Sequence, residues 1–241
     1  MKRYYYDLHN HSCLSPCADN DNTPANIAGM AYLSGIDIFA LTDHNTAKNC
    51  PAFFEAARRY GIIPVAGIEL TTSEDIHLVC LFEDLNSALD FDAFLQNKRT
   101  LIKNREEIFG EQLILDNNDN VIAKEEYFLP NATNISVEEA VPLVKEYGGV
   151  CYPAHIDRDA NGIIAILGTL PDTLPFSAVE FHSADKVEAY KEKYALSGKT
   201  IIVSSDSHYL TDINDKNSYF ELDCASDTED EVRKKLFELL K

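Results

Sequence analysis

The histidines of this 241-residue chain lie at or just past the ends of short apolar runs in the sequence. They are His9, His11, His44, His77, His155, His182 and His208. Four acids fall on the same ends, namely Asp7, Asp43, Glu69 and Asp206. A mixture of imidazole and carboxylate ligands suits Zn²⁺, Mn²⁺ or Fe²⁺ better than Ca²⁺ or Mg²⁺ alone. These residue types therefore predict a metal centre.

The spacing within two motifs supports this prediction. His9 and His11 are two residues apart on a predicted strand, so both side chains share one face and can hold one ion, and Asp206 and His208 have the same spacing. The candidate ligands are too numerous for one ion, because an ion takes about four to six ligands including water. We therefore expect two or three divalent ions, with Glu69 as a carboxylate that could bridge a pair.

The elements that must position these residues follow from the pattern of apolar residues. Seven compact apolar runs, typical of buried parallel strands, alternate with helical patterns. The runs are YYYDLH, IDIFALTDH, IIPVAGIEL, IHLVCLF, VCYPAH, SAVEFH and TIIVSSDSH. Thr23 before Pro24 predicts a helix start, and Ser136 with Glu139 predicts the capping box of a second helix. The alternation predicts a single α/β domain over residues 1–241, a distorted (β/α) barrel whose strand ends converge on one rim.

One segment departs from this alternation. Residues 83–134 show charged helical stretches and a turn at DNNDN, so they predict a mostly helical insertion or lid within the barrel. The glycine-rich fingerprints GxGxxG and GxxxxGK[ST] are absent, which argues against the common nucleotide-binding folds.

The charge of the chain narrows the class of partner. The formal net charge of −19 disfavours long nucleic acids, because their phosphates are bound mainly by Lys and Arg. Small phosphorylated molecules remain compatible with it, since divalent ions invert the local charge of an acidic site. The first twenty residues contain no apolar signal segment and no stretch is long enough to span a membrane, so we expect a cytoplasmic protein that does not bind membranes. The six cysteines are then expected to be reduced thiols.

Five ordered motifs carry a family resemblance. The stretches DLHNHS, ALTDHN, GIEL with IHLVCLF, PAHIDR and SSDSH, spanning residues 7–208, resemble the motifs of the PHP (polymerase and histidinol phosphatase) family. The resemblance implies a distorted seven-stranded (β/α) barrel with a trinuclear metal site. The family includes histidinol phosphatases, nucleoside-phosphate phosphoesterases and polymerase-associated exonuclease domains.

The resemblance also implies how the ligands divide among the ions. His9 and His11 would bind one ion together with Glu69 and Asp206, and Glu69 would bridge to a second ion held by His77 and His155. His44 and His208 would hold the third ion. In many relatives an acid in an SDG turn completes that third site, but here the turn is SPCADND. Counting back from the helix start places Asp19 in that position, with Asp21 as the alternative.

Several neighbouring residues receive supporting roles. Asp7 and Asp43 are expected to orient imidazoles rather than bind metal. Arg158 matches an arginine that follows this histidine motif in phosphoesterase members; it is predicted to clamp a phosphate, with a surface salt bridge as the alternative. His182 is expected at the rim without a ligand role. The thiols Cys13 and Cys17 flank the metal loop and are interpreted as having no metal role, because the family does not use them there.

Together these features predict a metal-dependent phosphoesterase that hydrolyses a small phosphorylated metabolite or nucleotide, with a metal-bridging hydroxide as the nucleophile. Glu69, Asp206 and Arg158 are the expected catalytic residues. One alternative is a regulatory module that binds metal or phosphate without turnover, and another is an exonuclease acting on DNA 3′ ends. A third is a related barrel that hydrolyses C–N bonds; a lysine after a middle strand would favour it, and Glu69 stands there instead.

Overall fold

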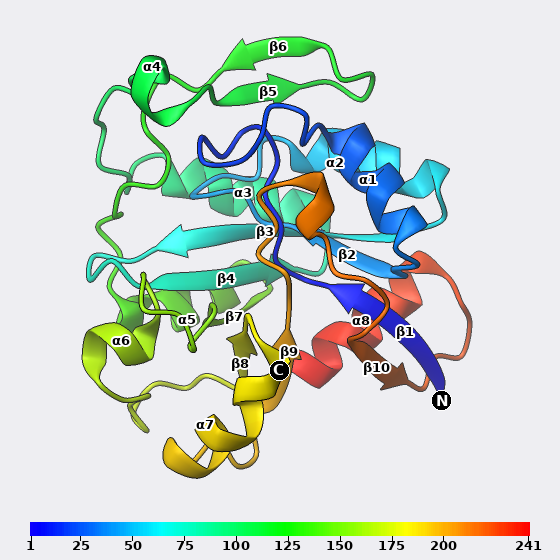
Figure 1. The fold of residues 1–241 in the computed structure, drawn as a ribbon, viewed down its shortest axis with the longest axis vertical. Helices are drawn as coiled ribbons and strands as arrows, with labels where there is room; N and C mark the ends of the chain where they lie inside the picture. Colours follow the sequence, from blue (N-terminus) through cyan, green and yellow to red (C-terminus); the bar gives the residue numbers. More distant parts are fainter.

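The computed structural model describes residues 1–241, and strands and helices alternate along most of this length (Figure 1). The strands are β1 (Lys2–Asp7), β2 (Ile38–Leu41), β3 (Ile63–Thr71), β4 (His77–Phe82), β5 (Leu113–Leu115), β6 (Val121–Lys124), β7 (Gly149–Pro153), β8 (Ala178–Phe181), β9 (Thr200–Val203) and β10 (Tyr219–Leu222). The helices are α1 (Pro24–Leu33), α2 (Cys50–Arg59), α3 (Leu85–Leu95), α4 (Glu106–Phe109), α5 (Val137–Glu146), α6 (Ile163–Leu167), α7 (Val187–Lys193) and α8 (Glu229–Leu240), with 3-10 turns η1 (Ala184–Lys186) and η2 (Leu210–Asp212). The seven predicted runs correspond to β1, β2, β3, β4, β7, β8 and β9.

The strands form the wall of a distorted TIM-like barrel, as the sequence predicts. Six strands make one sheet in the order β10-β1-β2-β3-β4-β7, and β8 pairs with β9 in a separate two-stranded sheet. The pairs β1/β2, β2/β3 and β8/β9 are parallel. The carboxyl ends of these strands therefore point to the same end of the barrel.

The prediction that all wall strands are parallel is wrong for β4. This strand pairs antiparallel with β3, from Thr71 opposite His77 to Ala66 opposite Phe82, and antiparallel with β7 on its other side. Only five residues separate β3 from β4, which is too short for a helical crossover and suits a reversal of direction. The reversal places the first residue of β4, His77, beside the last residue of β3.

Three strands are absent from the sequence prediction. The hairpin β5–β6 lies within residues 83–134, and β10 pairs antiparallel with β1 at the edge of the sheet. Every residue of β6 is exposed, and β5 has only three residues, so neither has the buried apolar run by which strands are predicted.

The helix ends form as their residue types predict. Thr23 accepts a hydrogen bond from the backbone N–H of Asn26 at the start of α1. Ser136 and Glu139 form the reciprocal capping box at the start of α5. None of the helices combines the length and the apolar composition needed to cross a lipid bilayer.

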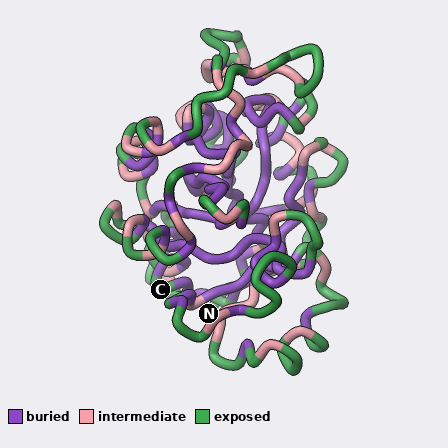
Figure 2. Tube along the Cα trace, turned by 90° about the vertical axis from the view of Figure 1, so that its left-hand side faces the viewer, coloured by how far each residue is buried: buried purple, intermediate pink, exposed green.

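Two apolar clusters stabilise the barrel, and their buried segments run through the middle of the molecule (Figure 2). The larger cluster packs the sheet against the helices of its outer face, including α1, α2, α3 and α5. The smaller one fills the inside of the barrel and includes Phe237 of α8. The α8 backbone accepts hydrogen bonds from Ser177 and Thr200 at the starts of β8 and β9. Helix α8 therefore closes the end of the barrel opposite the carboxyl ends of the parallel strands.

The segment 83–134 contains two parts with different surroundings. Phe91 and Leu95 of α3 are fully buried in the larger apolar cluster. The remainder extends to the hairpin β5–β6, which lies at the top of Figure 1 near α1 and α2. Leu113 donates a backbone hydrogen bond to Cys13, and a Cβ added to Gly110 would collide with the carbonyl oxygen of Pro16. This remainder therefore packs against the loop that follows the first histidine motif.

Candidate metal centre

The rim at the carboxyl ends of the parallel strands gathers eight of the nine candidate ligands. His9 and His11 follow β1, His44 follows β2, and Glu69 lies near the end of β3. The remaining four are His77 at the start of β4, His155 just after β7, and Asp206 and His208 after β9. Residues separated by up to two hundred positions thus meet at one end of the barrel because the strand ends converge there.

Glu69 is the centre of this cluster, and its side chain is 1% exposed. Three histidines approach its Oε1 atom: His77 Nδ1 at 2.7 Å, His9 Nε2 at 3.2 Å and His155 Nε2 at 3.2 Å. Two others approach Oε2, with His44 Nδ1 at 2.9 Å and His11 Nε2 at 3.3 Å. A carboxylate contacted on both oxygens in this way has the geometry needed to bridge two ions.

Asp206 completes a group on one side of Glu69. Its Oδ1 atom lies 3.2 Å from His11 Nε2 and 3.4 Å from His9 Nε2. The ligand atoms of His9, His11, Glu69 and Asp206 all lie within 4.8 Å of one another, and all four residues are buried. This is the ligand set that the family resemblance implies for one ion.

Two further groups of potential ligands share members with the first. One consists of His44, Glu69 and His77, and the other of His11, His44 and His208. His155 contacts Oε1 of Glu69, the oxygen that His77 also approaches. The cluster thus offers more than one metal position.

Opposite charges stabilise one another within the cluster. Burial alone would lower the pKa of His9, but the carboxylates of Glu180, Glu69 and Asp206 outweigh burial and hold this pKa well above its ordinary value. Burial would likewise raise the pKa of Glu69, yet His77 and His9 hold it well below its ordinary value. The site therefore favours positive charge among ionised carboxylates.

The arrangement of atoms around His9 fits a bound cation. Its Nδ1 atom lies 2.7 Å from Glu180 Oε1, a position from which it can only donate. Its Nε2 atom faces Glu69 Oε1 and lies 3.3 Å from Nε2 of His11. Two nitrogens and a carboxylate oxygen in this arrangement require a positive charge between them, either a proton or a metal ion. His155 Nδ1 is also buried without a hydrogen-bond partner, which buried polar groups in proteins ordinarily have.

Sequence reasoning missed Glu180, which orients the first histidine. This residue lies in β8, is 1% exposed, and accepts from both His9 Nδ1 and, at 3.1 Å, the backbone N–H of His155. A carboxylate that accepts a hydrogen bond from the ring nitrogen facing away from the metal fixes the tautomer and the orientation of a ligand histidine. The signal in the sequence was a lone acid inside the apolar run SAVEF.

Asp43 acts on the ligands through a serine. It accepts from the backbone and hydroxyl of Ser12 and, at 2.8 Å, from the hydroxyl of Ser15. Ser15 Oγ in turn lies 3.0 Å from His11 Nδ1 and accepts from the backbone N–H of His44. The predicted supporting role therefore holds, with one hydroxyl between the carboxylate and the imidazole.

Asp7 supports the other end of the cluster. It accepts from the backbone and hydroxyl of Ser205 and from the backbone N–H of Asn214. Burial raises the pKa of Asp7 to about 6 in spite of these hydrogen bonds. Asp7 thus fixes the chain next to Asp206 rather than contacting an imidazole.

The backbone is strained at two candidate ligands. Asp206 has a φ of +52° and His155 a φ of +27°, in a region that costs a non-glycine residue about 1–3 kcal/mol. Such conformations persist where the surrounding structure imposes them, and they are concentrated at functional sites.

The structure does not bring Asp19 to the cluster. Its backbone N–H donates to the carbonyl of His208 at 2.9 Å, but its exposed side chain accepts from the backbone N–H of Asp21, which is also exposed. Besides Ser15, Cys17 of this loop reaches the cluster, and its Sγ atom lies 3.3 Å from His44 Nε2. Burial would raise the pKa of this thiol, but His44 and His208 lower it to about 5. The sequence predicts that Cys17 flanks the metal loop without a metal role; in the structure this exposed residue places its sulfur next to His44, whereas the side chain of Asp19 does not contact the cluster.

A pocket of about 660 Å³ opens beside the cluster. It is lined by Cys17, Arg158, His182, Ser205, Asp206, His208, Tyr209, Asp212 and Asn214. Nη1 of Arg158 pairs with Oδ2 of Asp206, and the arginine side chain is 43% exposed. His182 lies at the rim, as the sequence predicts. A volume of this size suits a small ligand that is bound in contact with the cluster.

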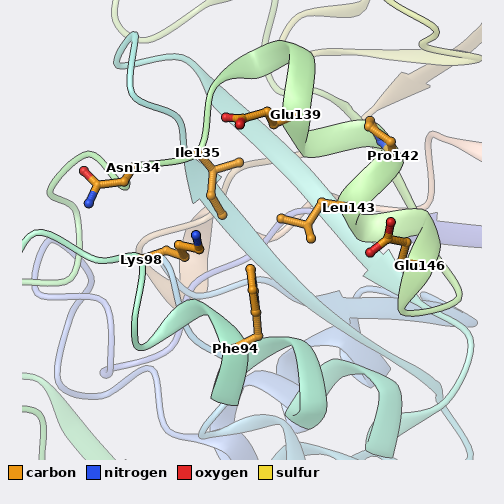
Figure 3. Close-up of a pocket in the computed structure, with 8 residues that line it drawn as sticks. All are labelled: Phe94, Lys98, Asn134, Ile135, Glu139, Pro142, Leu143 and Glu146. Carbon is orange, nitrogen blue, oxygen red and sulfur yellow. The ribbon is translucent and has the colours of Figure 1, made fainter.

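A second pocket, of about 280 Å³, lies between α3 and α5 (Figure 3). Phe94, Leu143 and Ile135 supply its apolar lining, and Lys98 lies at its edge. No histidine lines it, and Glu139 is engaged in the capping box of α5. We therefore assign the candidate function to the rim of the barrel.

The chain belongs to the PHP domain family, because the sequence model of that family matches residues 7–129, about half of the chain. The matched part contains five of the clustered ligands, and the structure adds His155, Asp206 and His208 from outside it. Family membership together with the His/Glu/Asp cluster defines the class of protein: a PHP domain whose clustered side chains could hold metal ions.

Similar proteins share parts of this architecture. A 5′-3′ exoribonuclease of Haemophilus influenzae is 32% identical over 111 residues, which cover 45% of this chain and 39% of that enzyme. The chain therefore spans well under half of the length of this relative. A lesion-specific endonuclease from Pyrococcus furiosus superposes with a TM-score of 0.71 at 18% identity, over 97% of this chain and 55% of that one. A protein from Bifidobacterium adolescentis, described as a metal-dependent phosphoesterase, superposes with a TM-score of 0.59 at 19% identity, over 99% of this chain and 97% of that one. At these identities the structural likeness shows the fold.

Proposed function

We propose that this protein hydrolyses a phosphoester bond of a small phosphorylated metabolite or nucleotide. The observation that carries the proposal is the buried cluster around Glu69, which opens through Asp206 into a pocket of about 660 Å³ containing Arg158. The cluster supplies metal ligands, the arginine supplies a phosphate-binding fork, and the volume lies in the range typical of small-ligand sites.

The ligand residues divide into groups that fit divalent metal. His9, His11, Glu69 and Asp206 would hold one ion, and Glu69 would share a second with His77 and His155. Metals bound there would supply Lewis-acid chemistry, lowering the pKa of a water molecule and offsetting the negative charge that develops on the phosphoryl group. Zn²⁺, Mn²⁺ and Fe²⁺ fit this donor set best.

Arg158 is positioned to orient the substrate. Its guanidinium group lies at the boundary between the cluster and the pocket, where it pairs with Asp206. Because the side chain is 43% exposed, it can turn toward a phosphate in the pocket, while the buried carboxylate of Asp206 keeps its contacts with His9 and His11. The fork would then donate two parallel hydrogen bonds to phosphate oxygens, which fixes the phosphorus relative to Glu69.

The chain's charge favours a small substrate over a long polymer. A net charge of −19 repels an extended phosphate backbone, whereas one or two phosphates can be neutralised locally by metal and Arg158. Tyr209 lines the pocket with half of its surface exposed and could stack against a nucleobase.

A second candidate function is the trimming of short RNA. It is favoured by the 32% identity to an exoribonuclease over 45% of this chain. Under this alternative the pocket would hold the terminal nucleotide of a strand. A regulatory module without turnover is less well supported, because eight of the nine candidate ligands meet at the rim of the barrel.

The test is hydrolysis by the Mn²⁺-loaded protein. A chromogenic phosphomonoester, the matching phosphodiester and a series of short oligoribonucleotides would be compared, with Asp206→Ala as the blank and the exposed Asp223→Ala as a matched control. Cleavage of a small ester above the blank supports the proposal, whereas a rate that rises with oligonucleotide length supports RNA trimming. Turnover of none of these substrates by protein that demonstrably holds metal would favour the regulatory module.

A further inference from the structure

The third group of ligands lacks a donor unless the loop after β1 supplies one. Nε2 of His11 is directed at Asp206 and His9, so this atom belongs to the first group. His44 and His208 are then the only histidines left for the third group. Two protein donors are fewer than the three or four that metal sites in proteins ordinarily use.

We propose that Cys17 is a thiolate ligand of the third metal position, together with Nε2 of His44 and His208. This inference rests on the metal-dependent function proposed above. It assigns to Cys17 the place that the sequence gives to Asp19.

The distances support this assignment. Cys17 Sγ lies 3.3 Å from His44 Nε2, the ring nitrogen on the side away from Glu69. His208 Nδ1 lies 2.9 Å from the carbonyl oxygen of Asp206, to which it can only donate. The proton of His208 is therefore on Nδ1, which leaves the lone pair of Nε2 free for an ion.

The loop that carries Cys17 is fixed by its own contacts. On one side, Ser15 Oγ donates to Asp43. On the other, the backbone N–H of Asp19 donates to the carbonyl oxygen of His208. Close packing of Gly110 against Pro16 restrains the loop from outside. The sulfur is therefore placed at the cluster by the backbone, and it also faces the pocket.

A sulfur donor changes which metal this position prefers. Thiolate and imidazole ligands select Zn²⁺, Co²⁺ or Fe²⁺. Oxygen ligands such as carboxylates shift the preference toward Mn²⁺ or Mg²⁺. The third position should then differ in metal preference from the first, where two carboxylates accompany two imidazoles.

The test uses the full-length protein loaded with Co²⁺, because a cobalt–thiolate bond gives a near-ultraviolet charge-transfer absorption that imidazole and carboxylate ligands do not give. We expect this absorption in the wild type and in Cys224→Ser. In Cys17→Ser we expect the absorption to be lost and the protein to bind one ion fewer per chain. Cys17→Asp should restore the ion without the absorption and shift the preference of the third position toward Mn²⁺.

Alkylation of the wild type gives a second readout that does not depend on how a variant folds. Iodoacetamide should modify Cys17 in the metal-free protein and leave it unmodified after Zn²⁺ is added, while Cys224, which is partly exposed, reacts in both states. The assignment of Cys17 is overturned if cobalt-loaded protein lacks the absorption, or if Cys17 is alkylated at the same rate with and without metal. Either result leaves the proposed function standing. Failure of the wild type to bind any metal overturns the assignment and the proposed function together.

Discussion

Glu180 offers a sharp test of how the cluster is held, because it contacts the ligands without belonging to any of the ligand groups. Its Oε1 atom accepts from His9 Nδ1 at 2.7 Å and from the backbone of His155 at 3.1 Å, in surroundings that leave the residue 1% exposed. Glu180→Gln keeps the shape and one acceptor oxygen but removes the charge that polarises the imidazole. Glu180→Ala removes the acceptor from both donors.

The expected magnitudes follow from these contacts. Loss of a carboxylate behind a ligand histidine typically lowers metal affinity about 10–100-fold, which corresponds to about 1.4–2.8 kcal/mol. We expect Glu180→Gln near the lower limit and Glu180→Ala near the upper one. Glu180→Ala should also lower the free energy of unfolding of the metal-free protein by about 1–3 kcal/mol, because two buried donors lose their partner.

Competition with a chromophoric chelator measures the metal affinity, and denaturant unfolding measures the stability. The exposed Glu221→Gln, whose carboxylate pairs only with Arg3 at the surface, is the matched control. Unchanged metal affinity in both Glu180 variants would refute the reasoning that His9 must be oriented from β8 in order to bind metal.

Three further predictions concern catalysis, pH and packing. His155→Ala should abolish phosphoester hydrolysis while the circular dichroism spectrum stays that of the wild type, and retained turnover would contradict its ligand role. Glu125→Gln should cost about 3 kcal/mol near pH 7, because it leaves the buried Arg99 without its carboxylate partner at 3.1 Å. Burial alone would raise the pKa of Glu125. The hydrogen bond from Lys48 and the charge of Arg99 outweigh burial and hold this pKa below its ordinary value of 4.5. The stabilisation is therefore present above pH 4.5 and lost as the pH falls through the lower folded-state pKa, so the denaturation midpoints of variant and wild type should converge in acid. Phe237→Ala should lower the free energy of unfolding by about 3–5 kcal/mol with little change in metal affinity, since Phe237 is fully buried in the barrel interior and α8 closes the opposite end; a large loss of metal affinity in the folded variant would contradict this separation.

Local patterns in the sequence were sufficient for much of the fold and of the ligand set. The run that contains Glu69 and the motif with His9 and His11 are short-range features, because strand periodicity and the spacing of two residues are properties of the extended backbone itself. The helix caps at Thr23 and Ser136 were equally local, since each depends on residues within one turn.

Contacts between distant segments decided the rest. The direction of β4 depends on pairing with β3 and β7, and only that pairing explains why His77, the first residue of its strand, meets ligands that follow theirs. The role of Glu180 required knowledge that β8 faces His9, which lies 171 residues away. The periodicity of apolar residues along one strand cannot predict a contact between two residues so far apart in the sequence.

The loop after β1 shows the same division most clearly. Its sequence offers Cys17, Asp19 and Asp21 within five positions, and the family resemblance favours an aspartate as the metal ligand. The tertiary structure instead turns Cys17 toward His44 and leaves both carboxylates in solvent, because hydrogen bonds to Asp43 and His208 fix the loop from both sides. Residue types at local spacings were enough to predict the family, the barrel and eight of the residues that meet in the cluster. Which side chain of an irregular loop lies next to His44 could not be predicted in this way, because it depends on backbone contacts between segments far apart in the chain.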